Sequence, residues 1–368
     1  MKWQEADYAF MSRALQLAER GKYSTQPNPR VGCVIVSENK ILGEGWHQFS
    51  DGAHAEINAL DALTGPLDNA SCYVSLEPCN HSGRTGPCTE ALIGAGVKRV
   101  IVAMSDPNPL VAGQGLARLE EAGIDTQVGL MQDEAIKLNP GFIMRMTEKR
   151  PYIRCKLAMS IDGKTAMASG ESKWITEAPA RQDVQALRAS SAAIMSGIGS
   201  VLADDPSLNV RDIDIGEREV LRVILDRQLR MPTKAKMSGL PGRTLVFTQS
   251  KDESRKDKID GSGAEVIVLE HAESFLRDVL QYLAEREQIN EVLLEAGAEL
   301  SGAMLEQDLI DEIILYQAPI LMGDTGKGLF HLLSIMKMED KVNLELIDSR
   351  MIGRDRRMTF NMTKKQTN

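Results

Sequence analysis

The chain has 368 residues, of which 43% are hydrophobic and 26% charged, with a formal net charge of −9. This length exceeds the roughly 100–200 residues of one typical domain, so it predicts two domains. The acidic balance argues against nucleic acid as a partner but leaves room for local basic pockets that bind a phosphorylated small molecule. No apolar run approaches the ~18 residues that cross a bilayer, and the acidic N-terminal segment does not resemble a signal peptide. We therefore expect a cytoplasmic protein with no membrane partner.

The first 147 residues predict one α/β domain in which helices cover both faces of a central sheet. Apolar residues recur at helical spacing over 3–20 and stop before Gly21, as in an amphipathic helix. The predicted order is then strand, strand, helix, strand, helix, strand, helix, strand. The strands are expected at 31–36, 41–46, 72–76, 97–105 and 126–131.

A charged segment that carries Pro151 marks the predicted junction, and residues 148–368 form a second α/β series that opens with a strand at "YIRCKLAMS". The tail 342–363 predicts two antiparallel strands around a polar turn, so the second sheet is expected to be mixed. Further strands are predicted at 192–197, 221–226, 244–248, 264–269, 291–297 and 312–321, and helices at 177–189, 273–287 and 299–307.

Three side chains in the first half are of the types that bind zinc: His54, Cys79 and Cys88. The five cysteines are an odd number, and inside a cell clustered cysteines are metal ligands or buried apolar residues rather than disulfides. Three ligands leave the fourth tetrahedral position of one zinc ion free for water, whose pKa the metal lowers from ~16 toward ~7. The pattern therefore predicts a catalytic metal site.

Glu56 lies two residues after His54, at the start of the same predicted helix. A carboxylate there can take a proton from the attacking water and return it to a ring nitrogen and a leaving amine. The motif "HAE" followed by Pro78 and Cys79 matches the H-x-E and P-C signature of nucleobase deaminases. It departs from that signature after Cys79, because eight residues rather than two precede Cys88.

Other interpretations remain open at this point. His54 and Glu56 can be a helix cap and a solvated acid, or the zinc site can be closed and structural, with His81 or Cys72 as a fourth ligand. Cys72 is instead expected to be buried, like Cys33. A nucleic-acid base deaminase would need a basic stripe and aromatic platforms, which 4% aromatic residues disfavour. A structural zinc module that carries a nucleotide-sensing domain is the alternative outside catalysis.

The second half contains glycine turns after strands but no G-x-G-x-x-G fingerprint, so a Rossmann domain is not supported. Gly297 begins a predicted helix whose N-terminus suits a phosphate, although such turns are often simple connections. Gly197 and Gly199 would let a cofactor approach the backbone closely. Asp162 is either a proton donor or the acid of a turn, and we favour the turn. The basic residues that could hold a phosphate, or be solvated charges, are Lys156, Arg188 and Arg211.

At "NPRVGCVIV", "HAEINAL" and "LEPCNHSGRTGPCTEALI" the first half resembles the deaminase domain of bifunctional riboflavin-biosynthesis enzymes. At "YIRCKLAMSIDGKTAMASGESKWIT", "VLADDPSLNVR" and "LLEAGAELSGAML" the second half resembles their reductase domain. The resemblance implies a cytidine-deaminase-like α/β/α domain at 1–147 and a dihydrofolate-reductase-like mixed-sheet domain at 148–368. It also implies a homo-oligomer.

In that family the deaminase hydrolyses the 2-amino group of a diaminopyrimidinone ribosylamine 5′-phosphate, and the reductase then uses NADPH to convert ribosyl to ribityl. The resemblance makes Glu56 the proton shuttle and His54, Cys79 and Cys88 the zinc ligands. It implies substrate contacts at Asn28, Lys156, Ser172, Arg188, Leu208, Arg211 and Glu295. It implies NADPH contacts at Ala158, Trp174, Ser200, Asp204, Gly297, Ala298, Glu299, Leu300, Ser301, Gly302 and Ala303. Gly86 replaces a proline of the family and is expected to loosen the loop before Cys88.

Overall fold

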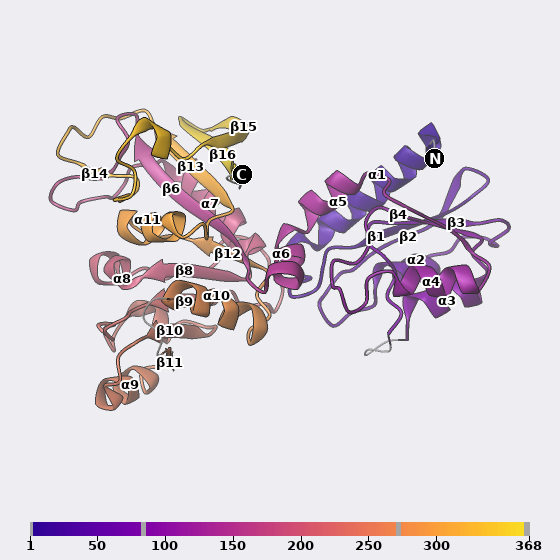
Figure 1. The fold of residues 1–368 in the computed structure, drawn as a ribbon, viewed down its shortest axis with the longest axis horizontal. Helices are drawn as coiled ribbons and strands as arrows, with labels where there is room; N and C mark the ends of the chain where they lie inside the picture. The colour runs from indigo at the N-terminus through magenta and orange to yellow at the C-terminus, as the bar shows by residue number, and fades with distance from the viewer. Residues whose placement is uncertain (1–2, 82–85, 270–273, 364–368) are drawn as a thin grey trace. The chain divides into compact units, whose positions relative to one another are not determined.

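The computed structural model describes residues 3–81, 86–269 and 274–363 of the chain. The chain divides into two compact units, Met1–Lys149 and Arg150–Asn368, and Figure 1 shows a separate sheet with its own helices in each. Gly86 is predicted to loosen the loop before Cys88, but residues 82–85 of that loop lie outside the described ranges. Among the described residues no helix is long and apolar enough to cross a membrane.

The first unit is built on a five-stranded sheet of order β2-β1-β3-β4-β5. β1 pairs antiparallel with both β2 and β3, whereas β3, β4 and β5 are parallel. The predicted order of helices and strands is confirmed. Its elements are α1 (Glu5–Glu19), β1 (Gly32–Ser37), β2 (Lys40–Trp46), α2 (Ala55–Asp61), β3 (Ser71–Val74), α3 (Cys88–Ala95), β4 (Arg99–Val102), α4 (Gln114–Glu121), β5 (Asp125–Val128), α5 (Gln132–Leu138) and α6 (Pro140–Glu148).

Helices cover both faces of this sheet, as predicted. Figure 1 shows α1 and α5 on one face and α2, α3 and α4 on the other. Alternate residues of one strand face the two layers: Val34 of β1 packs in the cluster of α1, and Cys33 and Ile35 pack in the cluster of α2 and α3. α5 and α6 were not predicted.

A glycine in β2 sets the depth of α2. A Cβ on Gly45 would lie only 2.3 Å from the carbonyl oxygen of Ala55, the first residue of α2. Glycine therefore lets the start of the helix rest directly on the sheet. This start is also where His54 and Glu56 lie, so the packing of α2 places two of the predicted functional side chains.

The second unit contains a nine-stranded mixed sheet of order β11-β10-β9-β8-β12-β6-β13-β16-β15, and β7 pairs with β14. The predicted antiparallel pair at the C-terminus is confirmed as β15 and β16. The short helices α8 and α9 were not predicted. The elements are β6 (Tyr152–Ser160), β7 (Lys164–Ala166), α7 (Ala178–Ser190), β8 (Ala193–Gly197), α8 (Ile198–Asp204), β9 (Leu221–Leu225), β10 (Thr244–Thr248), α9 (Glu253–Asp260), β11 (Glu265–Val268), α10 (Phe275–Glu285), β12 (Glu291–Leu294), α11 (Ala298–Glu306), β13 (Glu312–Ala318), β14 (Lys327–Gly328), β15 (Leu344–Ile352) and β16 (Asp355–Met362).

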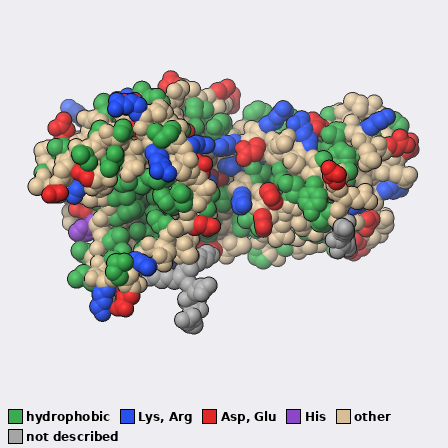
Figure 2. Space-filling model, turned by 90° about the horizontal axis from the view of Figure 1, so that it is seen from above, with side chains coloured by type: hydrophobic (Ala, Val, Ile, Leu, Met, Phe, Trp, Pro, Cys, Tyr) green, Lys and Arg blue, Asp and Glu red, His purple; other side chains and the backbone are tan. Residues whose placement is uncertain are grey.

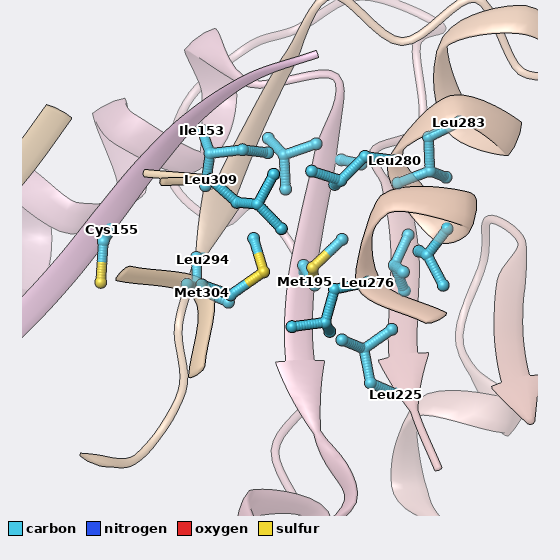
Figure 3. Packing of buried hydrophobic residues seen from close by; sticks show 14 of the residues in the cluster. Ile153, Cys155, Met195, Leu225, Leu276, Leu280, Leu283, Leu294, Met304 and Leu309 are labelled. Carbon is cyan, nitrogen blue, oxygen red and sulfur yellow. The ribbon is translucent and has the colours of Figure 1, made fainter. Parts of the chain in front are cut away.

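The largest core of this unit lies between the sheet and helices α10 and α11. Ile153 of β6 and Met195 of β8 meet Leu276 of α10 and Met304 of α11 there (Figure 3). On the opposite face α7 packs its apolar stripe against β12 and β13. The parallel strands β6, β8 and β12 therefore end at one edge of a sheet that is covered on both faces.

Charged side chains of both signs are visible on the face of the described residues that Figure 2 shows. On the face shown in Figure 2, Lys and Arg side chains alternate with Asp and Glu, and the charges drawn there form no continuous basic stripe.

Candidate active sites

The three predicted zinc ligands come together in the first unit. The ligand atoms of His54, Cys79 and Cys88 all lie within 4.8 Å of one another. His54 Nδ1 is 3.2 Å from Cys88 Sγ and 3.5 Å from Cys79 Sγ. One imidazole and two thiols in such a cluster fit tetrahedral zinc with one open position.

Two helix starts and one strand end create this cluster. His54 is the N-cap of α2, Cys88 is the first residue of α3, and Cys79 follows the end of β3. The amide of Cys88 points at Cys79 Sγ at 3.5 Å, and the amide of Thr89 donates to the carbonyl of Cys79 at 3.3 Å. The N-terminus of α3 thus holds the Cys79 segment and favours negative charge on its sulfur.

The two sulfurs differ in their affinity for a proton. Hydrogen bonds from Cys88 and His54 lower the pKa of Cys79 to about 4, despite burial. The hydrogen bond to Cys79 and burial raise the pKa of Cys88. The hydrogen bond with Cys79 also raises the pKa of His54. These contacts favour the thiolate form at Cys79, the form in which cysteine ligates a metal.

Glu56 is enclosed beside the ligands, with only 3% of its surface exposed. Burial raises the pKa of its carboxyl group to about 7. A carboxyl group with a pKa near neutrality can both accept and return a proton under ordinary conditions. This burial excludes the interpretation of Glu56 as a solvated acid.

The two residues considered as a fourth ligand lie outside this cluster in the described part of the chain. Cys72 is fully buried with its Sγ 3.4 Å from that of Cys33, so both cysteines are core residues as predicted. His81 is exposed. The arrangement favours an open site over a closed one.

Two residues that sequence reasoning missed support the site. Glu77 is 5% exposed, and its carboxylate accepts hydrogen bonds from the amides of Asp106, Gly113 and Gly115 at 3.0–3.1 Å. These bonds anchor the strand end that leads to Cys79.

The second residue is His47, which is 3% exposed and lies edge-on to His54, with ring centroids 5.4 Å apart. Burial lowers the pKa of His47.

In the second unit Glu295 joins two of the predicted basic residues. Its carboxylate receives two hydrogen bonds from Arg188, at 2.6 and 3.1 Å, and lies 3.6 Å from Lys156 Nζ. Arg188 also donates to the carbonyl of Asn209 at 3.0 Å. The neighbouring cations lower the pKa of Glu295 to about 2, although burial opposes the shift. The group is a pre-formed charged site built from the middle of β6, the last turn of α7 and the end of β12.

Several predicted cofactor contacts lie at strand ends. Gly297 is the N-cap of α11 and Gly197 that of α8, and Leu300 lies against Gly197. Asp204, at the end of α8, pairs with Lys173 at 3.0 Å. Ala158 of β6 packs beside α7, and Ser200 lies on α8. Ser172 is half-buried. The side chain of Trp174 is 69% exposed, and the guanidinium group of Arg181 lies over its ring. A cavity of about 520 Å³ opens beside Trp174 and reaches Asp355.

The other predicted contacts differ in accessibility. Leu208 is 3% exposed, so a ligand would reach its backbone, which has a φ of 43°. In α11 the hydroxyl of Ser301 faces Cys155 in the core, and a Cβ on Gly302 would lie 2.1 Å from the carbonyl of His331. Ala298, Glu299 and Ala303 are half-buried or exposed. Arg211 is exposed, and its amide donates to Gln185.

Asp162 joins two loops. Its carboxylate accepts hydrogen bonds from the amides of Met322 and Gly323 at 3.1 and 2.7 Å and from the hydroxyl of Ser160. These bonds lower the pKa of Asp162 to about 2. A carboxylate that stays ionised is a poor proton donor, so the contacts support the interpretation of Asp162 as the acid of a turn.

Comparison with known families gives two matches. Residues 151–357 match the RibD C-terminal domain, and residues 4–104 match the zinc-binding region of cytidine and deoxycytidylate deaminases. The riboflavin biosynthesis protein RibD of Escherichia coli K12 is 44% identical over 95% of this chain and 97% of its own length. RibD of Haemophilus influenzae is 44% identical over 98% of both chains.

Solved structures of similar proteins agree over nearly the whole chain. Acinetobacter baumannii RibD has a TM-score of 0.90 at 44% identity, covering 98% of this chain and 99% of that one. A diaminohydroxyphosphoribosylaminopyrimidine deaminase/5-amino-6-(5-phosphoribosylamino)uracil reductase from Thermotoga maritima has a TM-score of 0.86 at 30% identity, covering 97% and 99%.

Proposed function

We infer the roles of individual residues from the premise that this chain belongs to the RibD family, whose members join a deaminase and a reductase of riboflavin biosynthesis in one chain. It is a zinc-dependent deaminase and an NADPH-dependent reductase. The first activity hydrolyses the 2-amino group of 2,5-diamino-6-ribosylamino-4(3H)-pyrimidinone 5′-phosphate. The second reduces the ribosyl group of the product to ribityl.

The observation that carries the deaminase roles is the cluster of His54, Cys79 and Cys88 beside the buried carboxyl group of Glu56. Zinc held by these three ligands supplies a water molecule that is acidic enough to attack at neutral pH. Glu56 would accept one proton from the attacking water and pass it to the ring nitrogen, and would then carry the second proton, from the hydroxyl group added to the ring carbon, to the amine that leaves as ammonia. Asn28 hydrogen-bonds the substrate.

For the reductase we assign the substrate phosphate and sugar to the basic group around Glu295. Arg188 is fixed by two hydrogen bonds to Glu295, and Lys156 approaches the same carboxylate. Arg211 is exposed and free to close on a phosphate. Ser172 and Leu208 complete the substrate site. Bound NADPH would supply the hydride for C1′ of the opened sugar, and these residues would hold that carbon in position against the cofactor.

NADPH is assigned to the strand ends that meet around Gly197 and Gly297. The N-terminus of α11 suits a phosphate of the cofactor, and Trp174 is exposed for stacking. Ala158, Ser200 and Asp204 line the same edge. We place the deaminase in residues 1–147 and the reductase in 148–368. The division at Lys149 and the family matches at 4–104 and 151–357 support these bounds.

One time course tests both activities. Zinc-loaded protein, NADPH and the diaminopyrimidinone substrate are mixed, and NADPH absorbance is followed beside a chelator-treated sample. We expect oxidation that requires zinc, because the reductase acts only on the deaminated product. Chelated protein should regain NADPH oxidation when pre-deaminated substrate is supplied. A flat trace with that substrate would contradict the reductase assignment and leave the deaminase assignment intact.

We also propose that the protein is a homo-oligomer joined through β15, the edge strand of the nine-stranded sheet. An edge strand offers unpaired backbone groups to another chain, and both faces of β15 carry exposed apolar side chains, with Leu346 52% and Met351 61% exposed. In an antiparallel pair of two copies of β15 centred between Ile347 and Asp348, Glu345 would lie opposite Arg350. A two-fold axis relates the two copies, so the pair of Glu345 with Arg350 forms twice in the interface.

Charge reversal tests this interface. Arg350→Glu places like charges opposite each other and is expected to weaken association about tenfold. Adding Glu345→Arg restores complementarity and should restore association. Sedimentation velocity over a concentration series measures both effects. A monomeric wild-type chain, or association that Arg350→Glu leaves unchanged, would contradict the proposed interface.

We further propose the cytoplasm as the compartment of this protein. All five cysteines are free thiols in the structure, and two of them are assigned to zinc. Such thiols are maintained in a reducing compartment.

A further inference from the structure

His47 follows β2 and is enclosed in the first unit between the Asn28 loop and the start of α2. Both of its ring nitrogens have partners. Nδ1 lies 3.1 Å from the carbonyl oxygen of Ala53, and Nε2 lies 3.1 Å from Nδ2 of Asn28. Ala53 directly precedes the zinc ligand His54, so His47 joins the two segments that the proposed deaminase site needs.

These partners determine the tautomer of His47. A carbonyl oxygen can only accept a hydrogen bond, so Nδ1 must carry the hydrogen. In a neutral imidazole the other nitrogen is then an acceptor. Nε2 of His47 therefore accepts a hydrogen bond from Asn28.

The same logic determines the orientation of the Asn28 amide. Its Nδ2 also donates to the carbonyl of Ser50 at 2.7 Å, a contact that the amide oxygen could not make. Both hydrogens of the amide group are thus used within the protein. Among the described residues Oδ1 of Asn28 has no hydrogen-bond donor, and it is not enclosed. The oxygen is the part of Asn28 left for a ligand.

We propose that His47 is a positioning residue of the deaminase, which fixes the Asn28 amide so that Oδ1 accepts a hydrogen bond from an amino or hydroxyl group of the substrate. This inference rests on the proposed deaminase function. A flipped amide would present its NH2 group to the substrate and its oxygen to the carbonyl of Ser50. His47 and Ser50 together exclude that arrangement, because each supplies an acceptor and neither supplies a donor.

His47→Ala and His47→Gln separate this role from simple support of the fold. Glutamine offers one donor and one acceptor, as the neutral imidazole does. We expect His47→Ala to raise the KM of deamination about tenfold, the effect of losing roughly one hydrogen bond, with a smaller change in kcat. Zinc content and reductase activity should not change. His47→Gln should recover most of the KM, and His331→Gln, an exposed histidine of the other unit, is the matched control.

A double-mutant cycle with Asn28→Ala tests whether His47 changes the KM through Asn28. If His47 acts through Asn28, then His47→Ala should raise KM little further in the Asn28→Ala background. Additive effects of the two substitutions, or a His47→Gln variant no better than His47→Ala, would overturn the inference. Absence of deamination by the wild-type chain would instead overturn the proposed function on which it rests.

The tautomer of His47 can be determined by a measurement that does not depend on enzyme activity. The chain contains five histidines, so nitrogen NMR of the zinc-loaded, histidine-labelled protein can assign the ring of His47 with the two His47 variants as references. We expect hydrogen on Nδ1 and a bare Nε2. Hydrogen on Nε2 would overturn the inference, because that ring could not accept from Asn28.

Discussion

Replacement of Glu56 by glutamine is expected to lower the kcat of deamination about 10³-fold, within the range that proton transfer by a positioned side chain contributes. Glutamine keeps the shape of the side chain but cannot accept or return a proton. The three zinc ligands are unchanged, so the metal should remain bound. NADPH oxidation with pre-deaminated substrate should be unaffected, because the reductase site lies in the other unit.

Glu90→Gln is the matched control for this substitution. Glu90 also lies in the first turn of a helix that carries a zinc ligand, but its side chain is 48% exposed and pairs with Arg118. We expect its replacement to leave deamination within about twofold, since surface ion pairs contribute little. Ammonia release and zinc content are measured on the same preparations. Full activity of Glu56→Gln with zinc bound would favour a structural zinc module over a catalytic one.

The zinc site was predictable because its signal is local. His54 and Glu56 lie two residues apart at one helix start, Cys79 follows a strand and Cys88 begins the next helix, so the types and order of residues already suggest the cluster. The contribution of His47 is not local. Its role depends on the carbonyl of Ala53 and the amide of Asn28, and nothing in a histidine after a strand indicates either partner. Glu77 is similar, because its partners lie near residues 106–115.

Most strands of the two large sheets were predictable from apolar runs in the sequence, whereas the helices α8 and α9 were not. α8 and α9 have seven and eight residues. α9, "ESRKDKID", buries only Ile259, so almost no apolar stripe marks it. In the reductase site the motif resemblance indicates which turns matter but not which side chains face outward. Ser301 and Gly302 follow such a turn within α11 and are nevertheless buried.

Replacement of Glu295 by glutamine is expected to destabilise the second unit by about 3 kcal/mol at pH 7, because it leaves Arg188 and Lys156 without their shared anion. Both cations are largely buried, with side chains 12% and 20% exposed. Reductase activity should fall as well, since Arg188 loses the two hydrogen bonds that orient it. Hydrogen exchange of α7 and β12 under mild denaturant measures the local free energy of unfolding.

The dependence on pH makes this test specific to the carboxylate. Because the folded-state pKa of Glu295 is lowered from 4.5 to about 2, its stabilisation is fully present above pH 4.5 and is lost as the pH falls toward 2. The wild-type second unit should lose up to about 3 kcal/mol of stability across this window, and Glu295→Gln should lack that component. Glu265→Gln, which breaks the exposed ion pair with Arg243, is expected to retain it. An acid response of Glu295→Gln equal to that of the wild type would mean that Glu295 does not hold the two cations in solution.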